Sequence, residues 1–125
     1  MGALIEERGA SFSYSAVGSN TLVQVTSSPA VLYQILVSHS GGSVGYLQIY
    51  NNGTADGTAG TPDFAIPIGA GTSGAEIPGF RNVFYGPVGR GMDGGISYLF
   101  AAGATGTVAH GVNATVDLTY RGTIT

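Results

Sequence analysis

One glycine-rich stretch of this chain has the spacing of a phosphate-binding loop. The stretch GRGMDGG places Gly89, Gly91 and Gly94 in the pattern G-x-G-x-x-G, which closes the backbone around a pyrophosphate in dinucleotide-binding domains. That chemistry also needs a preceding strand, a following helix and an acidic residue about 20 positions further on. Here ISYLFAAG follows and predicts a strand, and the next acidic residue is Asp117, on the polar side of another predicted strand. The sequence therefore favours a glycine-rich turn over a nucleotide site.

Catalytic and metal-binding side chains are sparse. Nucleophilic catalysis needs a hydroxyl or thiol beside a base that an acid orients. The chain has no Cys, and its two histidines are His39, in a predicted turn, and His110, just before the last predicted strand. Neither lies in a catalytic motif, so we expect surface histidines and no enzyme. Asp56 and Asp63 could hold Ca²⁺ across their loop, but the D-x-D-x-D-G pattern is missing, so we expect no metal or other cofactor.

The aromatic residues are candidates for glycan binding, since sugar-binding modules stack rings on sugar faces. Their positions within or beside predicted strands favour core packing or subunit contact instead. The residues concerned are Tyr46, Tyr50, Phe84, Tyr85 and Tyr98.

Composition limits the possible partners. The net charge is −3 and the four arginines are scattered, which argues against nucleic-acid binding. No apolar run approaches the roughly 20 residues of a membrane helix, so we expect no membrane contact. Charged residues make up only 9% of the chain, where about 25% is ordinary. Such a neutral surface fits either a low-charge monomer or a protein whose surface is covered in an assembly.

The elements that must position these residues are strands. Gly or Pro interrupts almost every window of the chain, and alternating or short apolar runs lie between turn clusters. The pattern predicts an all-β fold, a two-sheet antiparallel β-sandwich of jelly-roll-like form with about seven or eight strands and essentially no helix. We expect residues 1–11 to form an N-terminal arm and residues 12–125 a single sandwich domain.

Four stretches make the strand prediction specific. In VNATVDLTY, strict alternation points Val116 and Leu118 to the core and Asp117 to the other face. AVLYQILVS, from Ala30, is apolar on both faces and predicts a central strand. VGYLQIY follows the turn SHSGGS, which predicts a hairpin between these two strands, with Leu47 and Ile49 inward. FAIPIG contains Pro67, which predicts an edge strand or a strand end.

From Val31 onward, the order of these features resembles a known family. The segments are VLYQILVSHSGGSVGYLQIYNNGT, TPDFAIPIGAGT, IPGF and GGISYLFAAGATGTVAHGVNATVDLTYR. They are similar to small β-sandwich virion proteins of tailed bacteriophages, of the head decoration or cement type. Two departures stand out: NVFYGPVGRGMDGG is longer than the turn usual at that place, and residues 103–111 lack acidic side chains. The longer segment predicts that GRGMDGG is the tip of an enlarged hairpin.

The resemblance implies a structural virion protein that decorates and reinforces the outer surface of a phage capsid. Its expected partners are the major capsid protein and other copies of itself, and it would lie on the outer capsid surface. The alternative is a fibre or tail module that binds a host glycan through loop aromatics. The residues expected at the assembly interface come from the arm and from the enlarged hairpin: Leu4, Ile5, Arg8, Phe84, Tyr85, Arg90 and Met92.

Overall fold

The described part of the chain is built of strands. The computed structural model describes residues 10–16, 22–52, 61–71, 79–105, 110 and 114–122, and these contain no helix. The strands are β1 (Ala10–Ala16), β2 (Val23–Thr26), β3 (Ala30–His39), β4 (Gly45–Tyr50), β5 (Phe64–Ile68), β6 (Gly79–Phe84), β7 (Arg90–Met92), β8 (Ile96–Ala101) and β9 (Ala114–Gly122).

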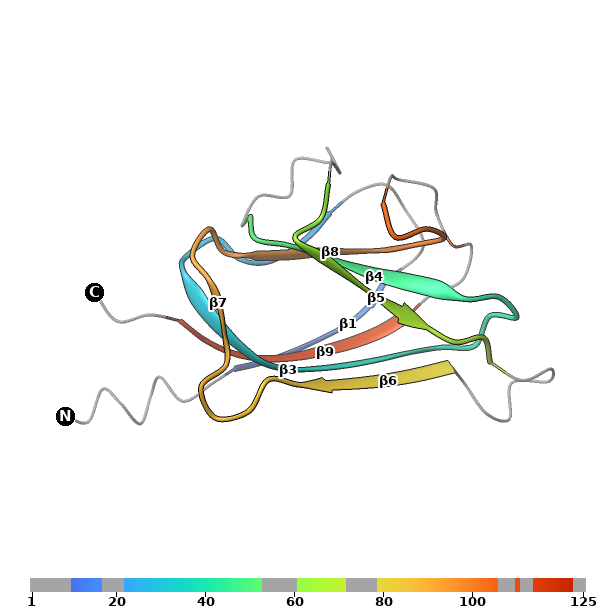
Figure 1. Ribbon diagram of the computed structural model, residues 1–125, viewed down its shortest axis with the longest axis horizontal. Coiled ribbons are helices and arrows are strands. Elements are labelled where there is room, and N and C mark those ends of the chain that lie inside the picture. Colours follow the sequence, from blue (N-terminus) through green and yellow to red (C-terminus); the bar gives the residue numbers. More distant parts are fainter. Residues whose placement is uncertain are drawn as a thin grey trace.

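The strands form two antiparallel sheets that lie one above the other (Figure 1). The first has the order β1-β9-β3-β6, with β7 also paired to β3, and the second has the order β2-β8-β4-β5. The predicted all-β sandwich is therefore confirmed. Strand β1 begins at Ala10, so Ala10 and Ser11, assigned above to the arm, lie in the sheet. Residues 1–9 lie outside the described part.

The core lies between the sheets and follows the predicted alternation. In β9, Val116 and Leu118 are fully buried while Asp117 between them is half-buried on the outer side. In β4, Leu47 and Ile49 are fully buried, as expected. The same inner layer contains Ile35 and Val37 from β3, Ile66 and Ile68 from β5, Met92 from β7, and Ile96, Tyr98 and Phe100 from β8.

A bulge explains why β3 is apolar at both odd and even positions. Its pairing with β9 shifts between Leu32 and Gln34, so that Tyr33 is the extra residue. One extra residue moves every later side chain to the opposite face. Leu32 before the bulge and Ile35 after it therefore both point into the core, where each is fully buried. The predicted central position of β3 is confirmed, because it pairs with β9, β6 and β7.

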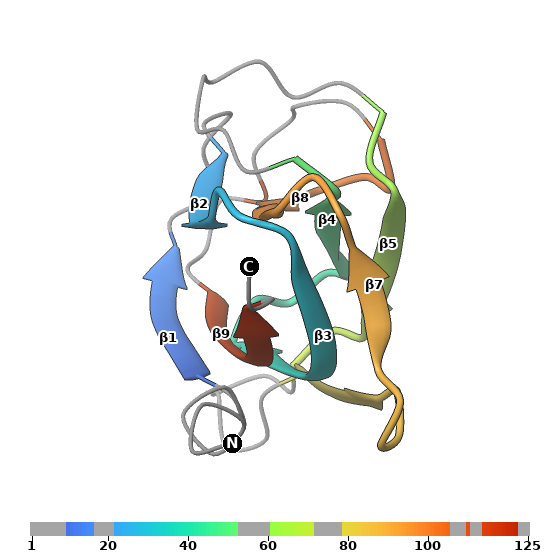
Figure 2. The same ribbon diagram turned by 90° about the vertical axis from the view of Figure 1, so that its left-hand side faces the viewer.

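Two local predictions are wrong. Strands β3 and β4 do not form a hairpin, because they belong to different sheets and residues 40–44 cross from one sheet to the other. GRGMDGG is not a hairpin tip: Arg90–Met92 is strand β7, which pairs with Ala30–Leu32, and the glycines after it turn the chain into β8 of the second sheet. Figure 2 shows β7 beside β3 at this crossing. Both errors arise because short glycine-rich segments connect sheets as readily as neighbouring strands.

The predicted edge position of β5 is confirmed, since β5 pairs with β4 alone and ends the second sheet. Pro67 is exposed on the outer side, opposite Tyr46. A proline there removes a backbone donor without interrupting a ladder on both sides.

Candidate functional site

The most exposed apolar side chains gather on β6 and the loop that follows it. Phe80 and Phe84 are 60% and 67% exposed, and Val88 is 84% exposed. Strand alternation places Phe80, Asn82 and Phe84 on one face and Val83 on the other, where it packs against the core. Solvent-facing phenylalanines on a strand are unusual in a monomer and indicate a contact surface. We call Phe80, Asn82 and Phe84 the β6 row.

The β6 row continues into a nearly uncharged sheet face. Register places Gln34, Leu36 and Ser38 of β3 beside the row. The next strand, β9, contributes its outward-facing residues to the same face: Thr115, Asp117 and Thr119. Asp117 is the one charged residue in these three rows. A surface of this composition loses little hydration free energy when another protein covers it.

Arg90 connects the two sheets at the edge next to the β6–β7 loop. Its Nη2 lies 3.1 Å from Asp63 Oδ2, in an ion pair whose side chains are about two-fifths exposed. The guanidinium also stacks 4.1 Å from the centre of the Phe64 ring and lies 5.8 Å from that of Tyr85. Phe64 and Tyr85 meet edge to face at 6.2 Å between ring centroids. Because Asp63 and Phe64 come from the β5 side and Arg90 from β7, this cluster ties the sheets together.

Burial raises the pKa of Tyr85 above its usual value of 10, and the nearby Arg90 charge partly opposes that shift. The phenol therefore stays protonated at neutral pH. Tyr85 packs against its neighbours in this cluster and does not serve as a base.

The structure separates the expected interface residues into three groups. Phe84 is on the surface, and Tyr85 and Arg90 meet in the cluster just described. Met92 is fully buried among core residues, so its side chain is not available for a surface contact. It was misassigned because the sequence predicted a hairpin tip where β7 covers the core. Leu4, Ile5 and Arg8 lie outside the described residues. Phe80 was missed, although Pro-Gly-Phe at a turn was visible in the sequence.

The two histidines, expected on the surface, meet at one end of the sandwich. His39 ends β3 and is 3% exposed, and its ring lies 4.9 Å from that of His110 and 5.2 Å from that of Phe100. The Gly41 N–H donates to His39 Nδ1 at 3.1 Å, so Nε2 carries the proton and faces Ile68 O at 3.4 Å. Gly45 makes room for this packing, because a Cβ there would overlap the Phe100 ring.

His110 also contacts Ser43, a pairing that resembles a nucleophile and its base. Its Nε2 lies 3.3 Å from Ser43 Oγ and 3.1 Å from Ser43 O. A carbonyl only accepts, so Nε2 is the donor and cannot also take the serine proton in this tautomer. Within the described residues Nδ1 of His110 has no hydrogen-bond partner, whereas a catalytic base is oriented through that atom. The contact fastens the loop after β3, and no described residue completes it as a catalytic triad.

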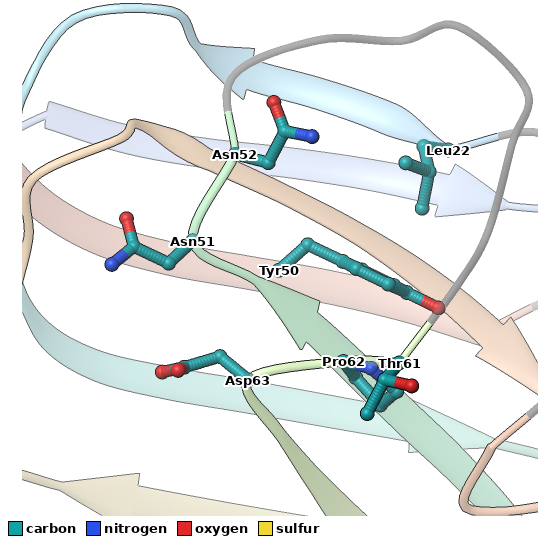
Figure 3. A pocket seen from close by; sticks show the side chains of 7 residues that line it. All are labelled: Leu22, Tyr50, Asn51, Asn52, Thr61, Pro62 and Asp63. Carbon is teal, nitrogen blue, oxygen red and sulfur yellow. The ribbon is translucent and has the colours of Figure 1, made fainter.

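A shallow pocket of about 440 Å³ lies where β4 ends and β5 begins. Leu22, Thr61 and Pro62 lie around the Tyr50 ring, while Asn51 and Asp63 point away from it (Figure 3). The Asn51 side chain is engaged twice: Nδ2 donates to Asp93 Oδ1 at 2.8 Å, and Gly94 N donates to Oδ1 at 2.7 Å. Asp63 pairs with Arg90, so these polar groups fasten neighbouring segments.

The described residues that were candidates for metal or glycan binding do not come together in one site. Asp56, one half of the considered Ca²⁺ pair, lies outside the described residues, and Asp63 pairs with Arg90. Across the described ranges no three His, Cys, Asp or Glu side chains come together as metal ligands. Tyr98 is fully buried and Tyr50 is 6% exposed, so neither offers a ring face for stacking. Tyr46 and Tyr85 are half-buried, which leaves Phe84 as the exposed member of that set.

Comparisons with known proteins add no relative. No family model, curated protein or solved structure matches this chain. In the described segments no helix has the length and hydropathy needed to cross a bilayer.

Proposed function

We propose that this protein is a non-enzymatic structural component of a phage virion, a capsid decoration protein that lies on the outer capsid surface and reinforces it. The observation that supports this most directly is the β6 row, with two phenylalanines more than half exposed at the border of a nearly uncharged sheet face. Exposed apolar side chains are costly to leave in water, which favours binding to another protein. The described residues also assemble no catalytic group.

The proposed mechanism is distributed contact with the major capsid protein. Each copy would lay the β6 row and the neighbouring face of β3 and β9 on the shell. Burying an exposed phenylalanine contributes on the order of 1–2 kcal/mol before ordering costs. One copy therefore binds weakly, and symmetric repetition with contacts among copies supplies the avidity. The low charge of the chain suits this role, since few ions need to be desolvated.

The N-terminal arm is a second proposed contact. Met1 to Ile5 form an apolar patch followed by the charge cluster Glu6, Glu7 and Arg8. In an assembly, Leu4 and Ile5 would be buried against a neighbouring subunit, with Arg8 paired at the rim. Deleting Met1 to Arg8 should then leave a folded domain with reduced occupancy on capsids.

Capsid binding tests the proposal. Phe80→Ser combined with Phe84→Ser should keep the fold and lower the occupancy of purified capsids at least about tenfold. Val44→Ser is the matched control, because Val44 is also exposed, at 42%, but directly precedes β4 of the other sheet. Unchanged occupancy in the double variant would remove β6 from the mechanism. Copy number in purified particles is the second measurement: abundance close to that of the shell protein supports decoration, and a few copies would favour the tail or fibre alternative.

A further inference from the structure

We propose that two copies of this chain pair edge to edge through β6, antiparallel, about a two-fold axis that passes through Asn82. The proposal deepens the proposed function by naming a second copy as one partner of the same surface. It rests on that function only for its role in a virion, because the pairing itself is a property of the purified protein.

Strand β6 is an open edge within the described part of the chain. It pairs with β3 on one side, and no other strand of the described chain pairs with it. Proteins normally block such edges with a proline, a bulge, a very short strand or a charged side chain. The second sheet does so at both ends: β5 contains Pro67, and β2 has four residues and an irregular register with β8. Strand β6 has six residues, no proline and no shift in its register with β3. Its one charge, Arg81, turns to Pro67 O, where Nη1 donates at 3.0 Å.

The β6 row matches itself under a two-fold rotation. Phe80 and Phe84 lie at equal distances in sequence on either side of Asn82. In an antiparallel pair centred on Asn82, each Phe80 is opposite the Phe84 of the second copy. Directly opposite aromatic side chains stabilise paired strands. A closed two-fold interface requires this kind of self-complementary patch.

Charge also permits the pairing. On the other face of β6, the same register sets Arg81 opposite Val83 of the second copy, so the two Arg81 side chains do not face each other directly. The β6 row itself is uncharged. Like charges directly opposite each other would destabilise such a pair. No residue of β6 therefore opposes self-pairing by charge.

Asn82 provides a polar match at the axis. Its Oδ1 accepts a hydrogen bond from Gln34 Nε2 at 3.1 Å. A carbonyl oxygen has two lone pairs, so Oδ1 can accept once more, and the Asn82 Nδ2 makes no hydrogen bond within the described residues. Across the axis each Nδ2 can donate to the Oδ1 of the other Asn82. The result is a ladder of four amides from Gln34 of one copy to Gln34 of the other.

The size of the contact sets its strength. A pair of six-residue strands with four phenylalanines buries on the order of several hundred Å², below the roughly 1,200 Å² of standard stable interfaces. We therefore expect a weak dimer in dilute solution, populated at high concentration. Pairing would join the exposed faces of two five-stranded sheets and bring the four phenylalanines into one apolar patch at their centre.

Cross-linking of single-cysteine variants tests this arrangement in the full-length protein, which has no native cysteine. Asn82→Cys treated with a short bis-maleimide should form a covalent dimer at least about tenfold faster than Thr115→Cys, because only residue 82 lies on the axis. Thr115 is the matched control, since it is exposed on the same sheet face two strands away. Equal rates for the two variants would overturn the proposal.

Sedimentation of charged variants gives an independent readout. Asn82→Lys should lower the dimer association constant at least about tenfold, because two ammonium groups would then face each other at the axis. Thr115→Lys should leave it unchanged, and circular dichroism checks that both variants fold. A wild-type protein that stays monomeric at every concentration, or an Asn82→Lys variant that dimerises normally, would refute self-pairing. These experiments use the purified protein without capsids. They therefore test self-pairing alone, and capsid attachment is tested separately by the occupancy measurement.

Discussion

The two sheets differ in what happens on their outer faces. In the four-stranded sheet, the outward side chains of β8 are buried, as are Gln48 and Tyr50 of β4, while Tyr46 is half-buried. Tyr50, Leu99 and Ala101 form a second apolar cluster with Leu22. In the five-stranded sheet, the outward side chains of β3, β9 and β6 are half-buried or exposed. The central strands β4 and β8 are thus covered on both faces, whereas β3, β9 and β6 are covered on one.

The covered face is held by hydrogen bonds to the segments that leave its own strands. Gln48 Nε2 donates to Gly103 O at 3.0 Å, just after β8, and Ser97 Oγ donates to Asn52 O at 2.6 Å, just after β4. The Tyr50 hydroxyl donates to Gln48 Oε1. Buried polar side chains are tolerated when paired in this way. Among the described residues the open face has no comparable cover, and it is the face that we propose for a partner.

The largest expected difference between the faces follows from burying a charge. Leu99→Asp should abolish folding or soluble expression, because an unpaired carboxylate at a position 2% exposed costs several kcal/mol. Thr115→Asp, on the open face, should change the free energy of unfolding by less than about 0.5 kcal/mol. Urea titration measures both. Val116→Asp, on the inner face, is the reference for a severe effect, and similar behaviour of Leu99→Asp and Thr115→Asp would erase the distinction between the faces.

Two glutamines make a matched pair of intermediate effect. Gln48→Leu should lower the free energy of unfolding by about 1–3 kcal/mol, since Gly103 O and the Tyr50 hydroxyl each lose a partner in a buried setting. Gln34→Leu removes only the exposed bond to Asn82 and should cost less than about 0.5 kcal/mol. Thermal denaturation of both variants distinguishes them. Equal losses would mean that the cover over Gln48 contributes nothing to stability.

Alkaline pH tests the covered face through Tyr50. Burial raises its pKa above 10, so above pH 10 the folded state holds a proton that the unfolded chain has released. The free energy of unfolding is therefore unaffected by Tyr50 ionisation below pH 10. Above pH 10 it falls as the pH rises, by at most about 1.4 kcal/mol per pH unit. Tyr50→Phe should flatten this decline. An unchanged slope in Tyr50→Phe would contradict the assignment.

The smallest expected effect on stability is on the open face itself. Phe80→Ser and Phe84→Ser should each change the free energy of unfolding by less than about 0.5 kcal/mol, because both rings already lie largely in water. A loss of several kcal/mol in urea titration would show that these rings support the fold and are not kept for a partner.

Sequence patterns predicted most strands and the inner core, and they failed at the connections. Alternation in β9 and the proline in β5 gave the correct faces and the correct edge, since both depend on local backbone geometry. The assignment of residues 40–44 and GRGMDGG to hairpins was wrong, because no local rule says which sheet the next strand joins. Met92 was misplaced for the same reason.

The sequence by itself determined that the chain forms an antiparallel β-sandwich with little charge, because side-chain period and composition are local properties. The tertiary structure decided which surfaces remain in contact with water. It brought His39 and His110 into contact at one end of the sandwich, covered Gln48 and left Phe80 and Phe84 exposed. These outcomes depend on contacts between residues far apart in the chain, such as Gln48 with Gly103 and β3 with β6. A pattern along one strand records which way a side chain points, and only the packed sheets determine what lies there.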